Sequence, residues 1–332
     1  MKAIQVSSPG APFELITKEI PEPTDNEVLI KVEACGICHG DAIAKEGHFQ
    51  GIKYPIIPGH EVVGIVEKAG PMVTDWKAGQ RVGVGWHGGH CHHCSACRRG
   101  DFGACEKSLT TGIHLDGGYA EYMIARSEVM VTIPEELSST DAAPILCAGR
   151  TTFGALKQCD AEGGDLIAIH GFGGLGHLAV QYAVKLGFRT VVLSRGKEKE
   201  ELAYKLGAHA YIDTCTGDPV KQLLKLGGAK VILCCAPSGK AIAELIPGLG
   251  RKGQAIIITA PPDMMEFHPA LLLGGERSIR GFVTGNIEDA IRFSLLTRVL
   301  PMVEVFPLEK AALAYEKMMT AKVRFRSVLK ME

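Results

Sequence analysis

The chain has 332 residues, of which 46% are hydrophobic, a length and composition that suit two domains with well-filled cores. The formal net charge is −1, which argues against nucleic acid and anionic membranes as partners. The chain has no apolar run of the roughly 18 residues that a membrane span needs, and we expect no signal peptide at its N-terminus. These features predict a cytoplasmic enzyme. Eleven cysteines in such a chain indicate metal ligands and free thiols, not a disulfide framework.

The first 130 residues are rich in predicted strands. β-Branched residues between glycine, proline and aspartate predict strands in residues 27–34, 60–69, 80–86 and 120–125. This region also offers Cys38, His60 and Glu61, with Asp41 close to the cysteine. Thiolate, imidazole and carboxylate are zinc ligands, and a catalytic zinc takes three protein ligands and keeps one position open. Cys38 and His60 would supply two of the three, although both could also be plain core residues.

A second cysteine group has the spacing of a closed metal site. Cys91, Cys94, Cys97 and Cys105 form the pattern C-x2-C-x2-C-x7-C. Four thiolates complete a tetrahedron around one zinc and stabilise a fold without chemistry, whereas ferredoxin clusters use a different last gap. Four unrelated surface thiols are the alternative. We interpret the neighbouring His90, His92 and His93 as exposed bystanders.

Cys147 follows in the apolar segment 141–156, where it is either a buried cysteine or the third ligand beside Cys38 and His60.

From about residue 150 the pattern changes to alternating strands and helices. Residues 166–170 predict a buried strand, residues 177–187 a helix and residues 190–194 the next strand. Between strand and helix lies G-x-G-x-x-G, in which Gly171 makes the turn, Gly173 admits the pyrophosphate and Gly176 packs helix on strand. This order predicts a dinucleotide site.

The alternation continues to about residue 285. Helices are expected near 198–206, from the cap Asp218 with Pro219, and after Ser238; strands are expected at 210–212, 231–235 and 254–259. Residues 286–320 are predicted to be helical, and residues 324–331 to form a closing strand.

These motifs resemble those of the zinc-containing medium-chain alcohol dehydrogenase family, over nearly the whole chain. Residues 59–73 fit the family signature G-H-E-x2-G-x5-[GA]-x2-[IVSAC], and the four-cysteine loop, the segment around Cys147 and the glycine loop follow in the family's order. The microbial and plant branches, including cinnamyl alcohol dehydrogenases, look most similar. The resemblance implies an α/β fold: a GroES-like, β-rich catalytic domain (1–150 and 286–332) and a Rossmann domain with a doubly wound parallel sheet (151–285).

The resemblance also implies roles for individual residues. Cys38, His60 and Cys147 match the catalytic zinc ligands, Glu61 a carboxylate that can approach the metal, and Asp41 the carboxylate that orients the ligand histidine. Phe49 and Trp86 match aromatic residues of the substrate pocket. The implied cofactor-binding residues are His39, Thr151, Gly171, Gly173, Gly174, Leu175, Gly176, Ser194, Arg195, Lys199 and Arg326. Two zinc ions per subunit and a homodimer or homotetramer are expected.

The residues after the second strand favour NADP(H) over NAD(H). An NAD enzyme normally places Asp or Glu there to bind the ribose 2′-hydroxyl. Here Ser194 and Arg195 stand at this position, with Lys197 and Lys199 nearby, and arginine suits a 2′-phosphate. A solvated basic turn with no cofactor contact, in an NAD enzyme, is the alternative.

The expected reaction is hydride transfer between the nicotinamide and a primary alcohol or aldehyde. Many relatives pass the hydroxyl proton through a Ser or Thr and a His, but this chain has Gly40 and Ile43 at those positions. A water in the space that Gly40 leaves, His48 or His39 could serve instead, and aldehyde reduction is weakly favoured. A zinc-stabilised binding or scaffold protein without catalysis is the alternative from another class.

Overall fold

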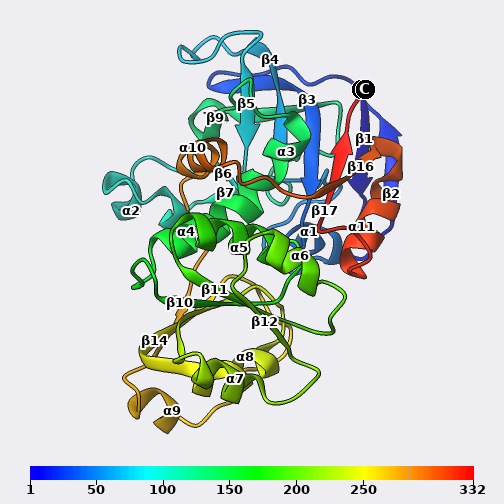
Figure 1. Cartoon of the computed structure of the whole chain (residues 1–332). Coiled ribbons are helices and arrows are strands. Elements are labelled where there is room, and N and C mark those ends of the chain that lie inside the picture. Colours follow the sequence, from blue (N-terminus) through cyan, green and yellow to red (C-terminus); the bar gives the residue numbers. More distant parts are fainter. Residues whose placement is uncertain (284) are drawn as a thin grey trace. The chain divides into compact units, whose positions relative to one another are not determined.

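The computed structural model describes residues 1–283 and 285–332. The chain forms two compact units, each with its own sheets (Figure 1). The first unit comprises Met1–Cys147, Ile287–Leu295 and Leu300–Glu332, and the second comprises Ala148–Asn286 and Leu296–Val299.

A seven-stranded sheet forms the centre of the first unit. Its order is β16-β17-β3-β4-β5-β9, with β8 also paired to β3. The pairs are antiparallel except β16 and β17, which run parallel. The strands are β3 (Glu27–Ile37), β4 (Val62–Ala69), β5 (Arg81–Val84), β8 (Tyr122–Arg126), β9 (Met130–Thr132), β16 (Val303–Pro307) and β17 (Arg326–Lys330). The predicted strands in the first 130 residues and at the C-terminus are therefore confirmed.

Alternating valine and isoleucine side chains explain this sheet. Val28, Ile30 and Val32 of β3 are fully or almost fully buried and pack in one core with Val62 and Val66 of β4. Two small sheets complete the strands of this unit: β1 (Lys2–Val6) with β2 (Phe13–Thr17), and β6 (His87–Gly89) with β7 (Leu109–Thr110).

The predicted single helical region 286–320 is wrong, because β16 interrupts it. The segment forms α10 (Ile287–Thr297), then β16, then α11 (Ala311–Met319). Val303 and Val305 alternate between two prolines, Pro301 and Pro307, and such a pattern suits a strand. The remaining α-helices of residues 1–157 are α1 (Asp41–Glu46), α2 (Ser95–Arg98), α3 (Ser139–Pro144) and α4 (Arg150–Lys157). The turn Ile145–Gly149 (η3) between α3 and α4 is π-helical.

The second unit is built on the predicted doubly wound parallel sheet. Its order is β12-β11-β10-β13-β14-β15, and every pair is parallel. The strands are β10 (Leu166–His170), β11 (Arg189–Ser194), β12 (Ala210–Asp213), β13 (Ala229–Cys234), β14 (Leu249–Ile257) and β15 (Ser278–Gly281). The strand order reverses beside β10, and ligands of such sheets bind at this point.

Helices cover both faces of that sheet (Figure 1). They are α5 (Gly176–Lys185), α6 (Glu200–Lys205), α7 (Pro219–Lys225), α8 (Gly239–Leu245) and α9 (Ala270–Leu273). Asp218 caps α7 as predicted, and Ser238 caps α8; each accepts a hydrogen bond from a backbone N–H three residues on. Among the described residues, no helix is long and apolar enough to cross a membrane.

Candidate active site and cofactor loop

Four potential metal ligands converge in the first unit. One ligand atom from each of Cys38, His60, Glu61 and Cys147 lies within 4.8 Å of the other three. Cys38 follows β3, His60 and Glu61 precede β4, and Cys147 lies in the π-helical turn η3, a feature often found at functional sites. The sulfurs of Cys38 and Cys147 are 3.9 Å apart. Two thiolates on one tetrahedral zinc, each at about 2.3 Å, would be about 3.8 Å apart.

The tautomer and orientation of the His60 imidazole suit a metal ligand. Its Nδ1 lies 2.9 Å from Oδ1 of Asp41, and because a carboxylate only accepts, Nδ1 carries the proton. Its Nε2 is buried and has no hydrogen-bond partner among the described residues. A buried polar atom without a partner is costly unless a ligand satisfies it, so the donor set fits a zinc ion.

The neighbours of Cys38 favour its thiolate form. Its sulfur also lies 3.4 Å from the backbone N–H of Gly40. The bond to Cys147, and then the nearby His60 and Arg326, lower the pKa of Cys38 well below its usual value, although burial opposes them. The thiolate is the form that binds a metal.

Glu61 is paired with a residue from the C-terminal strand. Nη2 of Arg326 lies 2.5 and 2.6 Å from the two carboxylate oxygens of Glu61, and both side chains are buried. Burial raises the pKa of Glu61 to about 7, although Arg326 counteracts this shift. A Cβ on Gly36 would stand 1.9 Å from Oε2 of Glu61, so only glycine fits there. Neither of these two contacts could be predicted from the sequence.

Of the two aromatic residues expected at the substrate pocket, Trp86 lies at this site. The Trp86 ring stands edge-on to His60, with centroids 4.8 Å apart. A Cβ on Gly40 would meet Cζ3 of Trp86 at 2.8 Å and Cε1 of His60 at 2.9 Å. The two rings therefore occupy the space that a side chain at residue 40 would need. Phe49 is 46% exposed and contacts His114 edge-on.

His39 and His48, the other two candidates for proton transfer, are both exposed.

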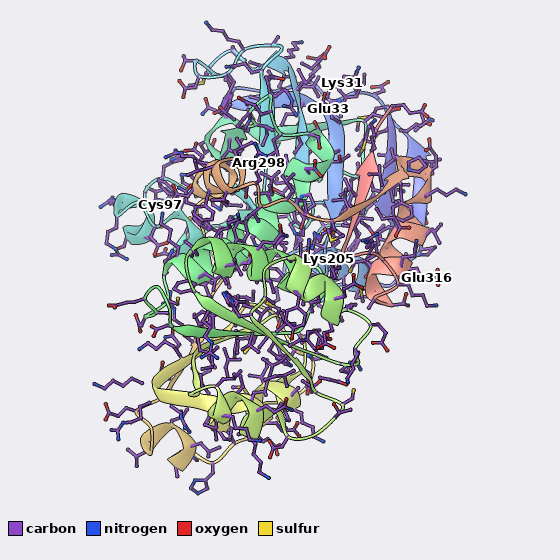
Figure 2. All side chains as sticks on the ribbon, in the orientation of Figure 1. Lys31, Glu33, Cys97, Lys205, Arg298 and Glu316 are labelled. Carbon is purple, nitrogen blue, oxygen red and sulfur yellow. The ribbon has the colours of Figure 1, made fainter. Side chains whose placement is uncertain are left out.

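The four cysteines of the second set converge on a loop of the first unit. Their sulfurs lie within 4.8 Å of one another, and Figure 2 labels Cys97 on this loop. The Sγ atoms of Cys94 and Cys97 are 3.5 Å apart, and the backbone N–H groups of Cys91 and Lys107 donate to Sγ of Cys105. Such N–H···S bonds stabilise thiolates around a metal.

His90 beside this loop is not the exposed bystander that we expected. It is 5% exposed, its Nδ1 lies 3.0 Å from Nε2 of His87, and its ring stacks on Phe102. His92 and His93 are exposed, as predicted.

The glycine loop of the second unit has the geometry expected of a phosphate-binding turn. Gly171 has φ +94°, in the left-handed region that favours glycine. A Cβ on Gly176 would lie 1.9 Å from the Gly171 carbonyl oxygen, whereas one on Gly173 would meet no described atom within 4 Å. Gly174 and Leu175 form the turn that enters α5, and Thr151 is a buried residue of α4.

The turn after β11 is held by the neighbouring strand. Tyr211 of β12 donates its hydroxyl to the Gly196 carbonyl at 2.8 Å, and Asp213 accepts the Gly196 N–H at 2.8 Å. Lys199 reaches back to the Phe172 carbonyl in the glycine loop at 3.2 Å. Partial burial and the charge of Arg195 lower the pKa of Lys199. This turn therefore brings basic groups to the edge of the glycine loop.

Comparison with known proteins gives consistent matches. Residues 24–135 match the alcohol dehydrogenase GroES-like domain, and residues 174–297 match the zinc-binding dehydrogenase domain. Alcohol dehydrogenase patD of Penicillium expansum is 46% identical over 97% of this chain and 95% of its own length. An alcohol dehydrogenase of Geobacillus stearothermophilus is 38% identical over 100% of both chains. The solved structure of a cinnamyl alcohol dehydrogenase from Sorghum bicolor is 29% identical, with a TM-score of 0.88 over 99% of this chain and 97% of the other.

Proposed function

Because the chain belongs to the zinc-containing medium-chain alcohol dehydrogenase family, we propose that Cys38, His60 and Cys147 hold its catalytic zinc and that it interconverts primary alcohols and aldehydes. The observation that carries this assignment is the buried Nε2 of His60, which lies beside two thiol groups and has no hydrogen-bond partner in the part of the chain that the structure describes. Glu61 lies within reach of the same point, and the Cys91–Cys105 set would hold a second, structural zinc.

In this mechanism the protein holds and orients the reacting groups. When bound, zinc supplies Lewis acidity toward the substrate oxygen, and the nicotinamide supplies or accepts the hydride. Asp41 fixes the proton on Nδ1 of His60 and so keeps Nε2 as a ligand. Arg326 restrains the Glu61 carboxylate at the edge of the set. Trp86, packed on His60, limits the room for substrate on that side.

The hydroxyl proton does not leave through residues 40 and 43 in this proposal. Gly40 and Ile43 carry no exchangeable side-chain proton, and Ile43 packs with Trp86 in a small apolar core around Val6, Ala44 and Ile56. His48 and His39 remain candidates for proton transfer. Aldehyde reduction must gain the same proton that alcohol oxidation loses; we expect reduction to tolerate a slow proton route better, and we favour it as the working direction.

We further propose that the cofactor is NADP(H). Ser194 places no negative charge at the end of β11, and Arg195 and Lys199 offer positive charge to a 2′-phosphate. Asp213 is the acid opposite Ser194 on β12, but its Oδ1 accepts the N–H groups of Gly196 and Cys215, and its Oδ2 accepts the Thr216 hydroxyl. Its carboxylate is therefore occupied by the turn and is less available to accept a ribose 2′-hydroxyl, which favours NADP(H) over NAD(H).

A homodimer or homotetramer is proposed as the assembly. β15 lies at the edge of the parallel sheet, and near it Leu273 and Val283 are 83% and 68% exposed. An unpaired edge strand with exposed apolar neighbours suits pairing with a second copy.

The deciding experiment is a panel of aliphatic, aromatic and allylic aldehydes assayed with NADPH and with NADH. We expect turnover of at least one class, with a higher kcat/KM for NADPH, and its loss in Cys38→Ser. Cys215→Ser, which changes an exposed cysteine of the other unit, is the matched control and should keep full activity. Absence of turnover by zinc-loaded wild-type protein with every aldehyde would contradict the proposal.

A further inference from the structure

We propose that Tyr119 is a positioning residue of the catalytic metal site, acting through Asp41. The inference rests on the proposed function, because it concerns the ligand His60. Tyr119 lies in the loop before β8, far in sequence from the ligands, and its side chain is completely buried.

The Asp41 carboxylate receives three hydrogen bonds, and Tyr119 supplies one of them. Oδ1 faces Nδ1 of His60 at 2.9 Å. Oδ2 accepts both the backbone N–H of Cys38 and the Tyr119 hydroxyl, each at 2.8 Å. Burial, and then the charge of Asp41, raise the pKa of Tyr119 well above its usual value, so that the hydroxyl keeps its proton and donates. Asp41 itself is 2% exposed, and the protein supplies its three donors.

Tyr119 also supports the backbone on the other side of His60. Its own N–H donates to the Pro58 carbonyl at 3.0 Å, and the N–H of Gly118 donates to the Gly59 carbonyl at 3.0 Å. Gly59 has φ +101°, and a Cβ there would stand 2.4 Å from Cδ1 of Tyr119. The tyrosine ring thus lies directly against the residue that precedes the ligand.

The two contacts give the hydroxyl a specific task. With Oδ2 held by two donors, the Asp41 carboxylate cannot rotate, and Oδ1 stays aimed at His60. Without the tyrosine hydroxyl, Oδ2 keeps only the Cys38 N–H, and the imidazole loses part of its restraint. Outer partners of metal ligands are commonly worth about 10- to 100-fold in metal affinity or activity.

A buried tyrosine that merely fills the core is the competing explanation, and the chain offers a matched control. Tyr315 belongs to the same hydrophobic core, and both tyrosines contact the ring of Phe13. Its hydroxyl is buried without a hydrogen-bond partner in the described part of the chain. Tyr315→Phe therefore removes the same atom from the same core without altering the donors to Asp41.

The test is zinc release to the chromogenic chelator 4-(2-pyridylazo)resorcinol from wild-type protein, Tyr119→Phe and Tyr315→Phe. We expect Tyr119→Phe to release one of its two zinc ions about tenfold faster than wild type, with the other unchanged. Tyr315→Phe should release both as wild type does. With cobalt in place of zinc, only Tyr119→Phe should change the visible absorption of the catalytic-site ion.

Two results would overturn the inference: wild-type release rates for Tyr119→Phe, or equal acceleration in both variants. The proposed function has a separate test: it fails if Cys38→Ser binds as much metal as wild-type protein does. As a second measurement, Asp41→Asn and the double variant Tyr119→Phe/Asp41→Asn should release zinc at similar rates, because the hydroxyl acts through the carboxylate. Independent, additive effects would also contradict the assignment.

Discussion

Arg326 and Glu61 lie 265 positions apart in sequence, yet one guanidinium nitrogen contacts both carboxylate oxygens, at 2.5 and 2.6 Å. Arg326 is 5% exposed and Glu61 is completely buried, so each charge depends on the other for compensation. Removing one partner should cost more than removing both.

Arg326→Met is therefore expected to lower the free energy of unfolding by about 3–5 kcal/mol, because it leaves a buried carboxylate unpaired. Adding Glu61→Gln should recover most of the loss. Urea unfolding of the two single variants and the double variant, all zinc-loaded, measures the coupling. Losses that simply add would show that the pair has no energetic coupling.

The two cysteine sets should differ in what they affect. Cys94→Ser opens the closed set and should lower the melting temperature while folded molecules still turn over, because that set does no chemistry. Cys38→Ser should abolish turnover, because it removes a ligand of the proposed catalytic zinc. Metal analysis should fall from about two zinc ions per chain to about one in each variant. A wild-type content near one ion in active protein would contradict the two-site assignment.

Gly40 should not tolerate a side chain. Gly40→Ala places a methyl group 2.8 Å from the Trp86 ring and should destabilise the protein by about 1–3 kcal/mol through overpacking. Gly40→Ala/Trp86→Leu should recover part of this loss, although the contact with His60 remains. Thermal unfolding of the three proteins, with Trp86→Leu alone as control, decides the point. Equal stability of Gly40→Ala and wild type would mean that the rings move away without cost.

Cofactor preference should reverse when an acid is placed at the end of β11. Ser194→Asp puts a negative charge where we expect the 2′-phosphate, so kcat/KM for NADPH should fall at least about tenfold, with NADH retained or improved. Lys199→Met should also weaken NADPH. Lys205→Met changes a lysine on the same segment, labelled in Figure 2, that pairs with Glu201, and should leave both values unchanged. An equal loss for both cofactors in Ser194→Asp would contradict the assignment.

His170 should make the protein less stable in mild acid. Burial lowers the pKa of His170 to about 4, whereas the unfolded chain titrates near 6.5. The unfolded state therefore binds more protons between these values, and stability falls as the pH drops. The loss between about pH 7 and about pH 5 should be about 2 kcal/mol larger in wild type than in His170→Leu. Equal losses, measured by urea unfolding at both pH values, would place the proton uptake elsewhere.

Local patterns accounted for most of the fold. The spacing from Cys91 to Cys105, the glycines after residue 170 and the β-branched runs in residues 27–69 each act through neighbours in sequence, which a single chain displays directly. The segment 286–320 failed because a five-residue strand between two helices has too short a pattern to outweigh its surroundings.

The supporting contacts of the site could not be predicted in the same way. Tyr119 and Asp41 are 78 positions apart, and nothing near Tyr119 indicates a polar partner. The pairing of Arg326 with Glu61, and of Gly40 with Trp86, likewise depends on the register of strands that meet only in the folded chain. His90 lies next to the four-cysteine set in sequence, yet its burial against Phe102 depends on a loop that follows it.

The two ligand sets span very different lengths of chain. Cys91 and Cys105 are 14 positions apart, whereas Cys38 and Cys147 are separated by 109. A metal at the longer set is a reversible cross-link that closes most of the first unit into a ring, and the entropy that such closure removes from the unfolded chain grows with loop length. Loss of an ion from this set should therefore remove the cross-link between distant strands as well as stop the reaction. The shorter set, by contrast, closes only a local loop, and losing its metal leaves the longer cross-link in place.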